Sequence, residues 1–342
     1  MENKAFTEDW INVFTDNQLS GQRIMAGFDG TGLNDDLKYI IDDLKAGGII
    51  LFARNIESPE QVRALCADVQ AYAERCGQPP LFIAIDQEGG VVARLKEPFT
   101  QFSDGNPGMR NRQDAHDFAE ITANELADIG VNMDMAPVMD VQPEGFEGIM
   151  EKRVFKGGPE FVSEMGGTLI SGLQDNGIMA VAKHFPGIGR TTLDSHLTQP
   201  VLDMDKETFE KTDLLPFKAA VKKNVSGMML SHIQYPFIDP EWPASLSVKV
   251  VKDLLRKRLN YDGVVMTDDL DMKAITMDIT TSVERIIKAD VDIALICHKS
   301  DDIENAFKVF LKDTLSSETS RADCINSVKR IMRLKADYLS TG

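Results

Sequence analysis

The segment IMAVAKHF, residues 178–185, contains five consecutive apolar residues followed by a lysine and a histidine. A run that is apolar at almost every position is typical of a strand buried on both faces, and such strands occur in parallel sheets. Lys183 and His184 then lie at the carboxyl end of the strand. Because a strand of this kind needs parallel partners, the same pattern is expected elsewhere in the chain.

Seven other segments of the 342-residue chain combine an apolar run with polar residues at its end, namely residues 24–30, 47–55, 81–90, 132–141, 227–233, 263–272 and 292–298. Between them lie stretches with apolar residues at helical spacing, including residues 58–77, 114–130, 207–224 and 247–260. Eight strands separated by helices predict an α/β chain folded as a (β/α)8 TIM-type barrel. A doubly wound sheet is the alternative, although no GxGxxG motif follows the first run.

No linker or low-complexity segment divides the chain, so one domain over residues 1–342 is predicted, with a C-terminal helix at about 317–339. The strand ends of a barrel share one rim, and active sites lie on that rim. Four of the five histidines fall at or just beyond the predicted strand ends, and only His116 lies on a predicted helix. The rim is therefore the predicted active site.

Composition excludes several classes of partner. The net charge of −17 repels phosphate backbones and anionic lipid, so neither nucleic acid nor a membrane surface is expected as a partner. No secretion signal or membrane span is expected, and the four cysteines lack metal-site spacing. These features predict a cytoplasmic protein with free thiols.

The chain resembles the family 3 glycoside hydrolases, and within them the bacterial β-N-acetylhexosaminidases that recycle cell-wall fragments. The resemblance runs in order through GQRIMAGFDG, GGIILFARNI, SPEQVRAL, AIDQEGGVVARL, MAPVMDV, KHFPG followed by DSH, and GVVMTDDLDM. It implies a (β/α)8 barrel and removal of a terminal, non-reducing β-N-acetylglucosamine residue. The implied partner is a small carbohydrate such as an N-acetylglucosaminide, with a muramyl peptide as one candidate aglycone. No cofactor and no metal are implied.

The resemblance also assigns the catalytic residues of a retaining glycosidase. Asp268, the first acidic residue after the seventh run, is the expected nucleophile, and the competing interpretation is that Asp268 caps a helix while Asp269 or Asp271 reacts. His196, paired with Asp194, is the expected acid/base. A histidine exchanges protons near neutral pH, and a carboxylate on its other nitrogen fixes the tautomer. The alternative for this pair is that it only pins a loop.

Sugar recognition is expected from the same rim. The resemblance assigns Asp86 as an acceptor for vicinal hydroxyls, with Arg94, Arg153, Lys183 and His184 as donors. The alternative for all five residues is structural salt bridging around the barrel mouth. His232 is expected to line the pocket wall and His298 to cap the eighth strand or contact solvent.

The segment KHFPGIGRTTLDSH, residues 183–196, departs from the family pattern KHFPGHG. Ile188 replaces a histidine that is not the expected acid/base, so a change in loop packing is predicted. Arg190 adds a positive charge that would suit an anionic aglycone. The glycines and proline are expected to form a hinge that brings His196 to the substrate.

Four other functions compete with the hexosaminidase interpretation. The same barrel could cleave another β-glycoside, or could use phosphate in place of water because a neutral histidine tolerates a neighbouring anion. From a different class, the chain could be a sugar-binding protein that has lost catalysis. A metal-dependent hydrolase with His184, His232 and Asp268 as ligands is a further alternative, although no HxH follows the first run.

Overall fold

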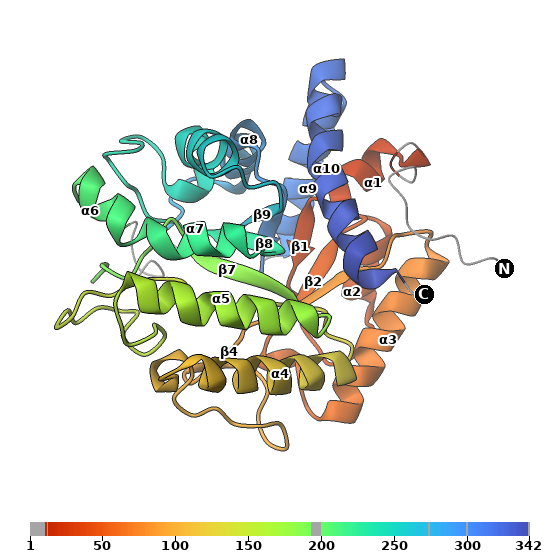
Figure 1. The fold of residues 1–342 in the computed structure, drawn as a ribbon. Helices are drawn as coiled ribbons and strands as arrows, with labels where there is room; N and C mark the ends of the chain where they lie inside the picture. Colours follow the sequence, from red (N-terminus) through yellow and green to blue (C-terminus); the bar gives the residue numbers. More distant parts are fainter. Residues whose placement is uncertain (1–10, 12, 193–199, 273, 299, 341–342) are drawn as a thin grey trace.

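The computed structural model describes residues 11, 13–192, 200–272, 274–298 and 300–340. Eight parallel strands form one sheet, in the order β10-β1-β2-β3-β6-β7-β8-β9. A bridge between Met266 and Ile293 joins the two ends of this order. The sheet therefore closes into the predicted (β/α)8 barrel, and the doubly wound alternative is wrong. Figure 1 shows the strands at the centre of the molecule, with helices covering them.

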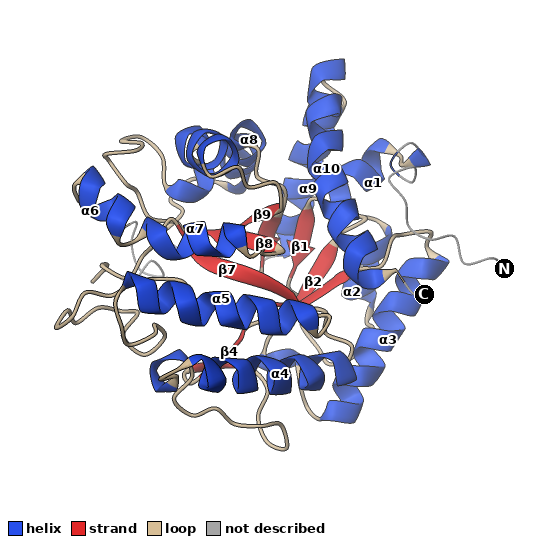
Figure 2. Cartoon of the chain, in the orientation of Figure 1, coloured by secondary structure: helices blue, strands red, loops and turns tan. Residues whose placement is uncertain are grey.

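The barrel strands are β1 (Ile24–Ala26), β2 (Gly48–Leu51), β3 (Phe82–Ile85), β6 (Met133–Asp134), β7 (Met179–Phe185), β8 (Gly227–Leu230), β9 (Val264–Thr267) and β10 (Ala294–Ile296). The helices of the outer layer, which Figure 2 separates by colour from the strands, are α1 (Asp16–Gly21), α2 (Asp35–Asp42), α3 (Pro59–Arg75), α4 (Arg112–Asp128), α5 (Pro159–Asp175), α6 (Lys206–Lys211), α7 (Leu214–Lys222), α8 (Ile279–Ala289), α9 (Ser300–Thr314) and α10 (Glu318–Leu339).

Three local predictions need correction. Residues 132–141 form only the short strand β6, after which Val138 makes an isolated bridge to Lys183, because Pro137 lacks a backbone donor. Residues 207–224 form two helices, α6 and α7, and residues 249–258 form the π-helix η5 (Lys249–Arg258). Besides the barrel, β4 (Gln87–Gly89) and β5 (Val92–Ala93) form a hairpin after β3.

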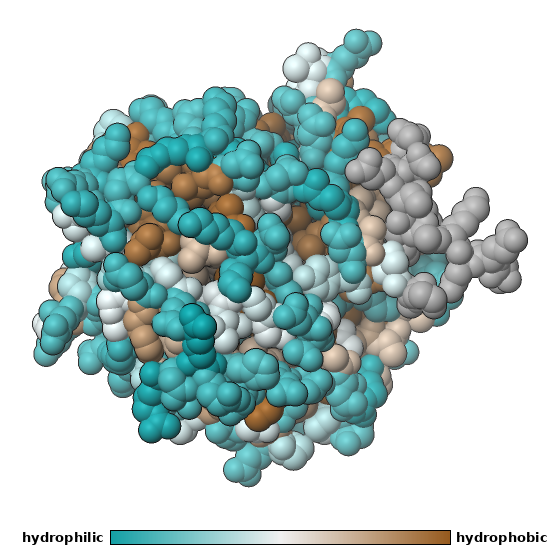
Figure 3. Space-filling model, in the orientation of Figure 1, coloured by the Kyte–Doolittle hydropathy of each residue, from teal (hydrophilic) through white to brown (hydrophobic). Residues whose placement is uncertain are grey.

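The apolar core has two layers separated by the barrel wall. Alternate residues of β3 illustrate the division: Phe82 and Ala84 belong to the cluster inside the barrel, while Ile83 and Ile85 pack against the surrounding helices. The interior cluster is rich in methionine, which fills irregular space well. The outer face shown in Figure 3 is mostly hydrophilic, with apolar areas between the helices. Among the described helices, none is long and apolar enough to cross a lipid bilayer.

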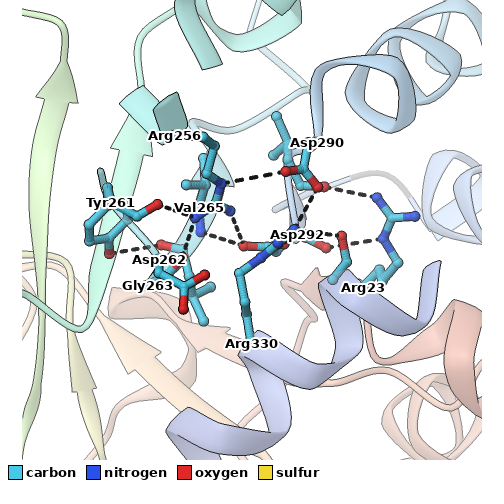
Figure 4. Close-up of polar contacts among 12 residues, drawn as sticks. Arg23, Arg256, Tyr261, Asp262, Gly263, Val265, Asp290, Asp292 and Arg330 are labelled. Atoms are coloured by element: carbon cyan, nitrogen blue, oxygen red, sulfur yellow. Dashed lines mark hydrogen bonds and ion pairs between the residues drawn. The ribbon is translucent and has the colours of Figure 1, made fainter. Parts of the chain in front are cut away.

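A buried ion network ties the C-terminal helix to the barrel (Figure 4). Asp292 is fully buried and accepts hydrogen bonds from Arg256 Nη2 at 2.7 Å, Arg330 Nε at 2.8 Å and the Val265 backbone at 2.8 Å. Arg23 donates to the Asp292 carbonyl at 3.3 Å. Because its oxygens are fully used, Asp292 acts as a structural junction between η5, β9 and α10.

The amino-terminal end of the barrel is closed by α10. Ile331 and Leu334 pack with the interior cluster, and the neighbouring Lys335 is fully buried. The Lys335 Nζ donates to Gln22 Oε1 at 2.7 Å and to the Gly47 carbonyl at 2.8 Å. Burial lowers the pKa of Lys335 to about 7. The site-bearing end of the barrel is therefore the opposite, carboxyl end.

This buried lysine predicts a specific pH dependence of stability. Because the folded-state pKa of Lys335 lies below the unfolded value of about 10.4, the unfolded chain binds more protons between these values. The contribution of Lys335 to the free energy of unfolding therefore rises by up to about 1.4 kcal/mol per pH unit above pH 7. In urea unfolding at pH 7 and 9, Lys335→Met is expected to lose this rise, while Lys329→Met, an exposed change on the same helix, keeps it. Equal slopes for wild type and Lys335→Met would contradict the assignment.

Candidate active site

The carboxyl ends of β3 and β7 bring four of the predicted sugar-binding residues together. Asp86 follows β3 directly, Arg94 follows the β4–β5 hairpin, and Lys183 and His184 end β7. Arg153 comes from the turn before α5. Strand position thus fixes three of these side chains, and two loops supply the arginines.

Lys183 is the centre of the site. Its side chain is 2% exposed, and its Nζ lies 2.8 Å from Asp86 Oδ1 and 2.6 Å from Glu88 Oε1. Arg94 contacts the other oxygen of Asp86 at 2.9 Å. Arg153 donates two hydrogen bonds to Glu88. Its Nε lies 3.0 Å from Glu88 Oε2, and its Nη2 lies 2.7 Å from Glu88 Oε1. Two carboxylates and three cations form one continuous network.

The electrostatics of this network hold both carboxylates in the charged form. Burial raises the pKa of Asp86, but the Lys183 and Arg94 cations outweigh it and hold this pKa well below its usual range. Lys183 and Arg153 lower the pKa of Glu88 against the same opposing effect of burial. Burial lowers the pKa of Lys183, and the charges of Asp86 and Glu88 raise it above its usual value. At neutral pH the site is therefore fully ionised, and it can form charge-assisted hydrogen bonds to hydroxyl groups.

His184 is oriented by a second buried carboxylate. Its Nδ1 lies 2.8 Å from Oδ2 of Asp140, which is completely buried, and its Nε2 lies 3.3 Å from Arg153 Nη2. Because the guanidinium only donates, Nδ1 carries the proton and Nε2 accepts. With Nδ1 bound to Asp140, His184 offers an acceptor at Nε2 and not the donor that was expected. Asp140 Oδ1 accepts from the Ile188 backbone at 2.8 Å, so the histidine and the following loop share one anchor.

Asp268 occupies the first position after β9 and is half-buried. Its backbone donates to the Leu230 carbonyl at 3.0 Å, and its Oδ1 accepts from the Asp269 backbone at 2.8 Å. Among the described residues, none donates a hydrogen bond to its Oδ2. By contrast, Asp269 Oδ1 is used by the backbones of Asp271 and Cys297, at 3.0 and 3.1 Å. Of these acids, Asp268 has the carboxylate oxygen that is available to a substrate.

His232 forms a hydrogen bond with the turn that carries Asp268. It is 1% exposed, and its Nε2 donates to the Asp269 carbonyl at 2.9 Å while its Nδ1 pairs with Ser245 Oγ at 2.8 Å. Burial lowers the pKa of His232, which favours the neutral ring. His184 and His232 each have both ring nitrogens engaged, and they form no metal-ligand cluster with Asp268 within the described ranges.

Asp194 and His196 lie outside the described residues. The chain before them is well fixed: Ile188 is buried, and Tyr235 donates to the Gly187 carbonyl at 2.7 Å. A Cβ on Gly189 would lie 2.2 Å from the Val141 carbonyl oxygen, so this glycine is required by close packing. These contacts describe the packing of the loop, and the hinge at its glycines and proline stays a prediction.

Arg190 does not present a free positive charge to an aglycone. Its Nε lies 2.9 Å from Oδ2 of the completely buried Asp213, and its Nη2 donates to Thr212 at 3.1 Å. The positive charge expected to suit an anionic aglycone is therefore offset, because a carboxylate from the start of α7 pairs with it.

Sequence reasoning left Glu88, Asp140 and Asp134 out of the site. Glu88 and Asp140 are the partners that Lys183 and His184 require, and their place after apolar runs was a usable signal. Asp134 lies in β6, completely buried, where its Oδ1 accepts from the Gln87 backbone at 3.0 Å. Burial raises the pKa of Asp134 to about 7. Its place inside the apolar run at residues 132–141 was a usable signal of burial.

The chain is similar to proteins of one family over most of its length. The model of the glycosyl hydrolase family 3 N-terminal domain matches residues 17–334. A β-hexosaminidase from Nitrosomonas eutropha is 34% identical over 311 residues, which cover 88% of this chain and 87% of the relative. A family 3 β-N-acetylglucosaminidase structure from a Paenibacillus species matches with a TM-score of 0.92 at 35% identity, over 96% of this chain and 64% of that one.

A third similar structure contains a sugar derivative. It is NagZ from Neisseria gonorrhoeae in complex with N-trifluoroacetyl-D-glucosamine, which matches with a TM-score of 0.76 at 27% identity, over 88% of this chain and 95% of that one.

Proposed function

We propose that this chain, which belongs to glycoside hydrolase family 3 and is a β-N-acetylhexosaminidase, is a retaining enzyme. In this proposal it removes a terminal, non-reducing β-N-acetylglucosamine residue. The observation that supports this best is the ionised network of Asp86, Lys183 and Arg94 at the mouth that also holds Asp268. The charges of both Asp86 and Asp268 act on the nearby Cys297 thiol, so the two carboxylates share one region of the rim.

The network suits the non-reducing sugar. Asp86 is the more exposed of the two acids in the network, with 15% of its side chain accessible. Its carboxylate can accept hydrogen bonds from two neighbouring hydroxyls. Lys183 and Arg94 keep it charged, and these two residues and Arg153 can donate to sugar oxygens. His184 presents Nε2 toward the same side as Arg153. The ion pairs and the sugar contacts are therefore compatible roles of the same side chains.

The proposed reaction has two steps. An oxygen of Asp268 attacks the anomeric carbon and the glycosidic bond breaks. The leaving oxygen keeps the electron pair of that bond and receives a proton from His196. Water then attacks the glycosyl-enzyme, gives a proton back to His196, and releases Asp268 as a carboxylate. Asp194 would hold the His196 ring in the tautomer that this exchange needs.

The proposed natural substrates are peptidoglycan fragments that carry N-acetylglucosamine at the non-reducing end. Because Asp213 neutralises Arg190, an anionic muramyl peptide gains no support from that residue. Comparing kcat/KM for an N-acetylglucosaminyl–N-acetylmuramyl compound with that for chitobiose tests this choice of aglycone. A cytoplasmic location stays a prediction of the sequence.

The first test is release of nitrophenol from the β-N-acetylglucosaminide and from the β-glucoside, with and without phosphate. We expect kcat/KM for the N-acetylglucosaminide to be higher by on the order of 10²-fold or more, since a group that hydrogen-bonds the acetamide would lose that partner in the glucoside. Phosphate should not change the rate. Strong stimulation by phosphate would indicate a phosphorylase, equal rates another β-glycosidase, and activity on neither substrate a sugar-binding protein.

A further inference from the structure

Three different ligand types meet beside the proposed nucleophile. Asp269, Cys297 and His298 each offer one donor atom, and these three atoms lie within 4.8 Å of one another. Asp269 belongs to the turn after β9, and the other two residues directly follow β10. These are the neighbouring strands whose bridge closes the barrel, so the cluster lies where the two ends of the sheet meet.

Two of the donors are held in place by the backbone. Asp269 Oδ1 accepts from the Cys297 backbone at 3.1 Å and from the Asp271 backbone at 3.0 Å. The Cys297 carbonyl accepts from Arg54 Nη2 at 2.7 Å, which fixes the peptide of this residue from the other side. Cys297 is 1% exposed, so its thiol has little freedom to turn away.

The third donor can complete the site with a small movement. His298 Nδ1 lies 3.2 Å from Asp269 Oδ2, and half of the His298 side chain is exposed, at 52%. A tetrahedral zinc ion with bonds of about 2.0–2.3 Å needs ligand atoms roughly 3.5 Å apart. The His298–Asp269 pair is close to that spacing, and all three donor atoms lie within 4.8 Å of one another. Rotation of the exposed imidazole is one way to bring the donors together on a single ion.

The donor set and its surroundings select the kind of cation. One thiolate, one imidazole and one carboxylate suit a borderline-soft ion such as zinc or cadmium rather than magnesium or calcium, which prefer oxygen ligands. The nearby carboxylates of Asp268 and Asp86 add negative charge around the thiol. Binding would release the thiol proton, and the three residues would leave a fourth position of the cation for another ligand such as water.

We propose that Asp269, Cys297 and His298 form a binding site for one thiophilic divalent cation of the zinc type. The cation is a ligand of the rim and takes part in no step of the proposed reaction. Its expected effect is inhibition, because a double positive charge beside Asp268 stabilises the carboxylate and weakens it as a nucleophile. This effect rests on the proposed function, whereas the binding itself does not.

The test uses cadmium as a spectroscopic probe of the purified enzyme. A cadmium–thiolate bond gives an ultraviolet charge-transfer band, which we expect to saturate at one equivalent in the wild type and to be lost in Cys297→Ser. In His298→Gln, an exposed change, calorimetry should show zinc affinity weakened by at least about 10-fold. The matched controls are Cys76→Ser, a thiol beside Asp42, and His116→Gln, a histidine beside Asp117 and Glu120; both should bind as the wild type does.

Several outcomes would overturn the proposal. A cadmium band that persists in Cys297→Ser, or that disappears in Cys76→Ser, would place the ion elsewhere, and unchanged zinc affinity in His298→Gln would remove the histidine from the site. Activity is measured separately. Binding at one equivalent without inhibition would leave the site intact and overturn the expected electrostatic effect of the cation on Asp268.

Discussion

Replacing Asp268 with alanine is expected to lower kcat for the β-N-acetylglucosaminide by on the order of 10⁴-fold or more, because no covalent glycosyl-enzyme can then form. The substitution should leave the free energy of unfolding nearly unchanged, since the carboxylate makes only one described hydrogen bond, to the Asp269 backbone. Steady-state kinetics and urea unfolding measure the two quantities.

Chemical rescue gives this prediction its sharpest form. Azide fits the space left by the carboxylate and can attack the anomeric carbon from the same face, so it should restore turnover of an activated substrate and give the α-glycosyl azide. A β-azide, or no azide product, would argue against a nucleophile at position 268. Asp269→Asn tests the competing assignment: a 10⁴-fold loss there, with Asp268→Ala fully active, would move the nucleophile by one residue.

The barrel was predictable because its strands are short and buried on both faces. Runs such as residues 178–185 and 263–272 contain few polar residues before their carboxyl ends. This pattern predicts the number of strands and the position of the polar rim at their carboxyl ends. The failures lie where backbone hydrogen bonding departs from a regular ladder. Pro137 shortens β6, and the β4–β5 hairpin is built from the polar sequence QEGGVVA, which has no apolar alternation to indicate a strand.

The residues of the site were predictable as types but not as pairs. A lysine after a strand indicates a cation on the rim, yet only the structure shows that Lys183 is held by Glu88 as well as by Asp86. The same holds for Arg190, whose partner Asp213 lies 23 residues further along the chain. The position of a residue in a strand predicts which face of the sheet its side chain lies on and how near it is to the end of the strand. Its hydrogen-bonding partners from other strands and loops depend on the register of the strands and on the path of the loops.

Replacing Lys183 with methionine is expected to lower the free energy of unfolding by about 3–5 kcal/mol, because two buried carboxylates lose the cation between them. Catalysis should fall as well, since Asp86 then faces the sugar without the charge that orients it. Lys211→Met is the control: Lys211 pairs with Glu207 on the surface, where 71% of its side chain is exposed, so its loss should change little.

The pH dependence of this effect distinguishes charge from packing. In the wild type the folded-state pKa values of Asp86 and Glu88 lie below the unfolded values of about 3.9 and 4.3, so their contribution is complete above those values and is lost only as the pH falls through the folded ones. Without Lys183, burial raises both pKa values, and protonation should relieve the strain. The difference in unfolding free energy between wild type and Lys183→Met should therefore shrink as the pH falls from 7 toward 4.

A double variant completes the argument. Glu88→Gln combined with Lys183→Met removes one of the stranded charges and leaves Arg153 with a neutral partner, so the combined loss should be smaller than the sum of the single losses by about 0.5–3 kcal/mol. Additive losses that do not depend on pH would mean that Lys183 contributes through the packing of its hydrocarbon chain alone. In that case the site would not be an ionised network, and Asp86 would need another source of the charge that makes it a sugar ligand.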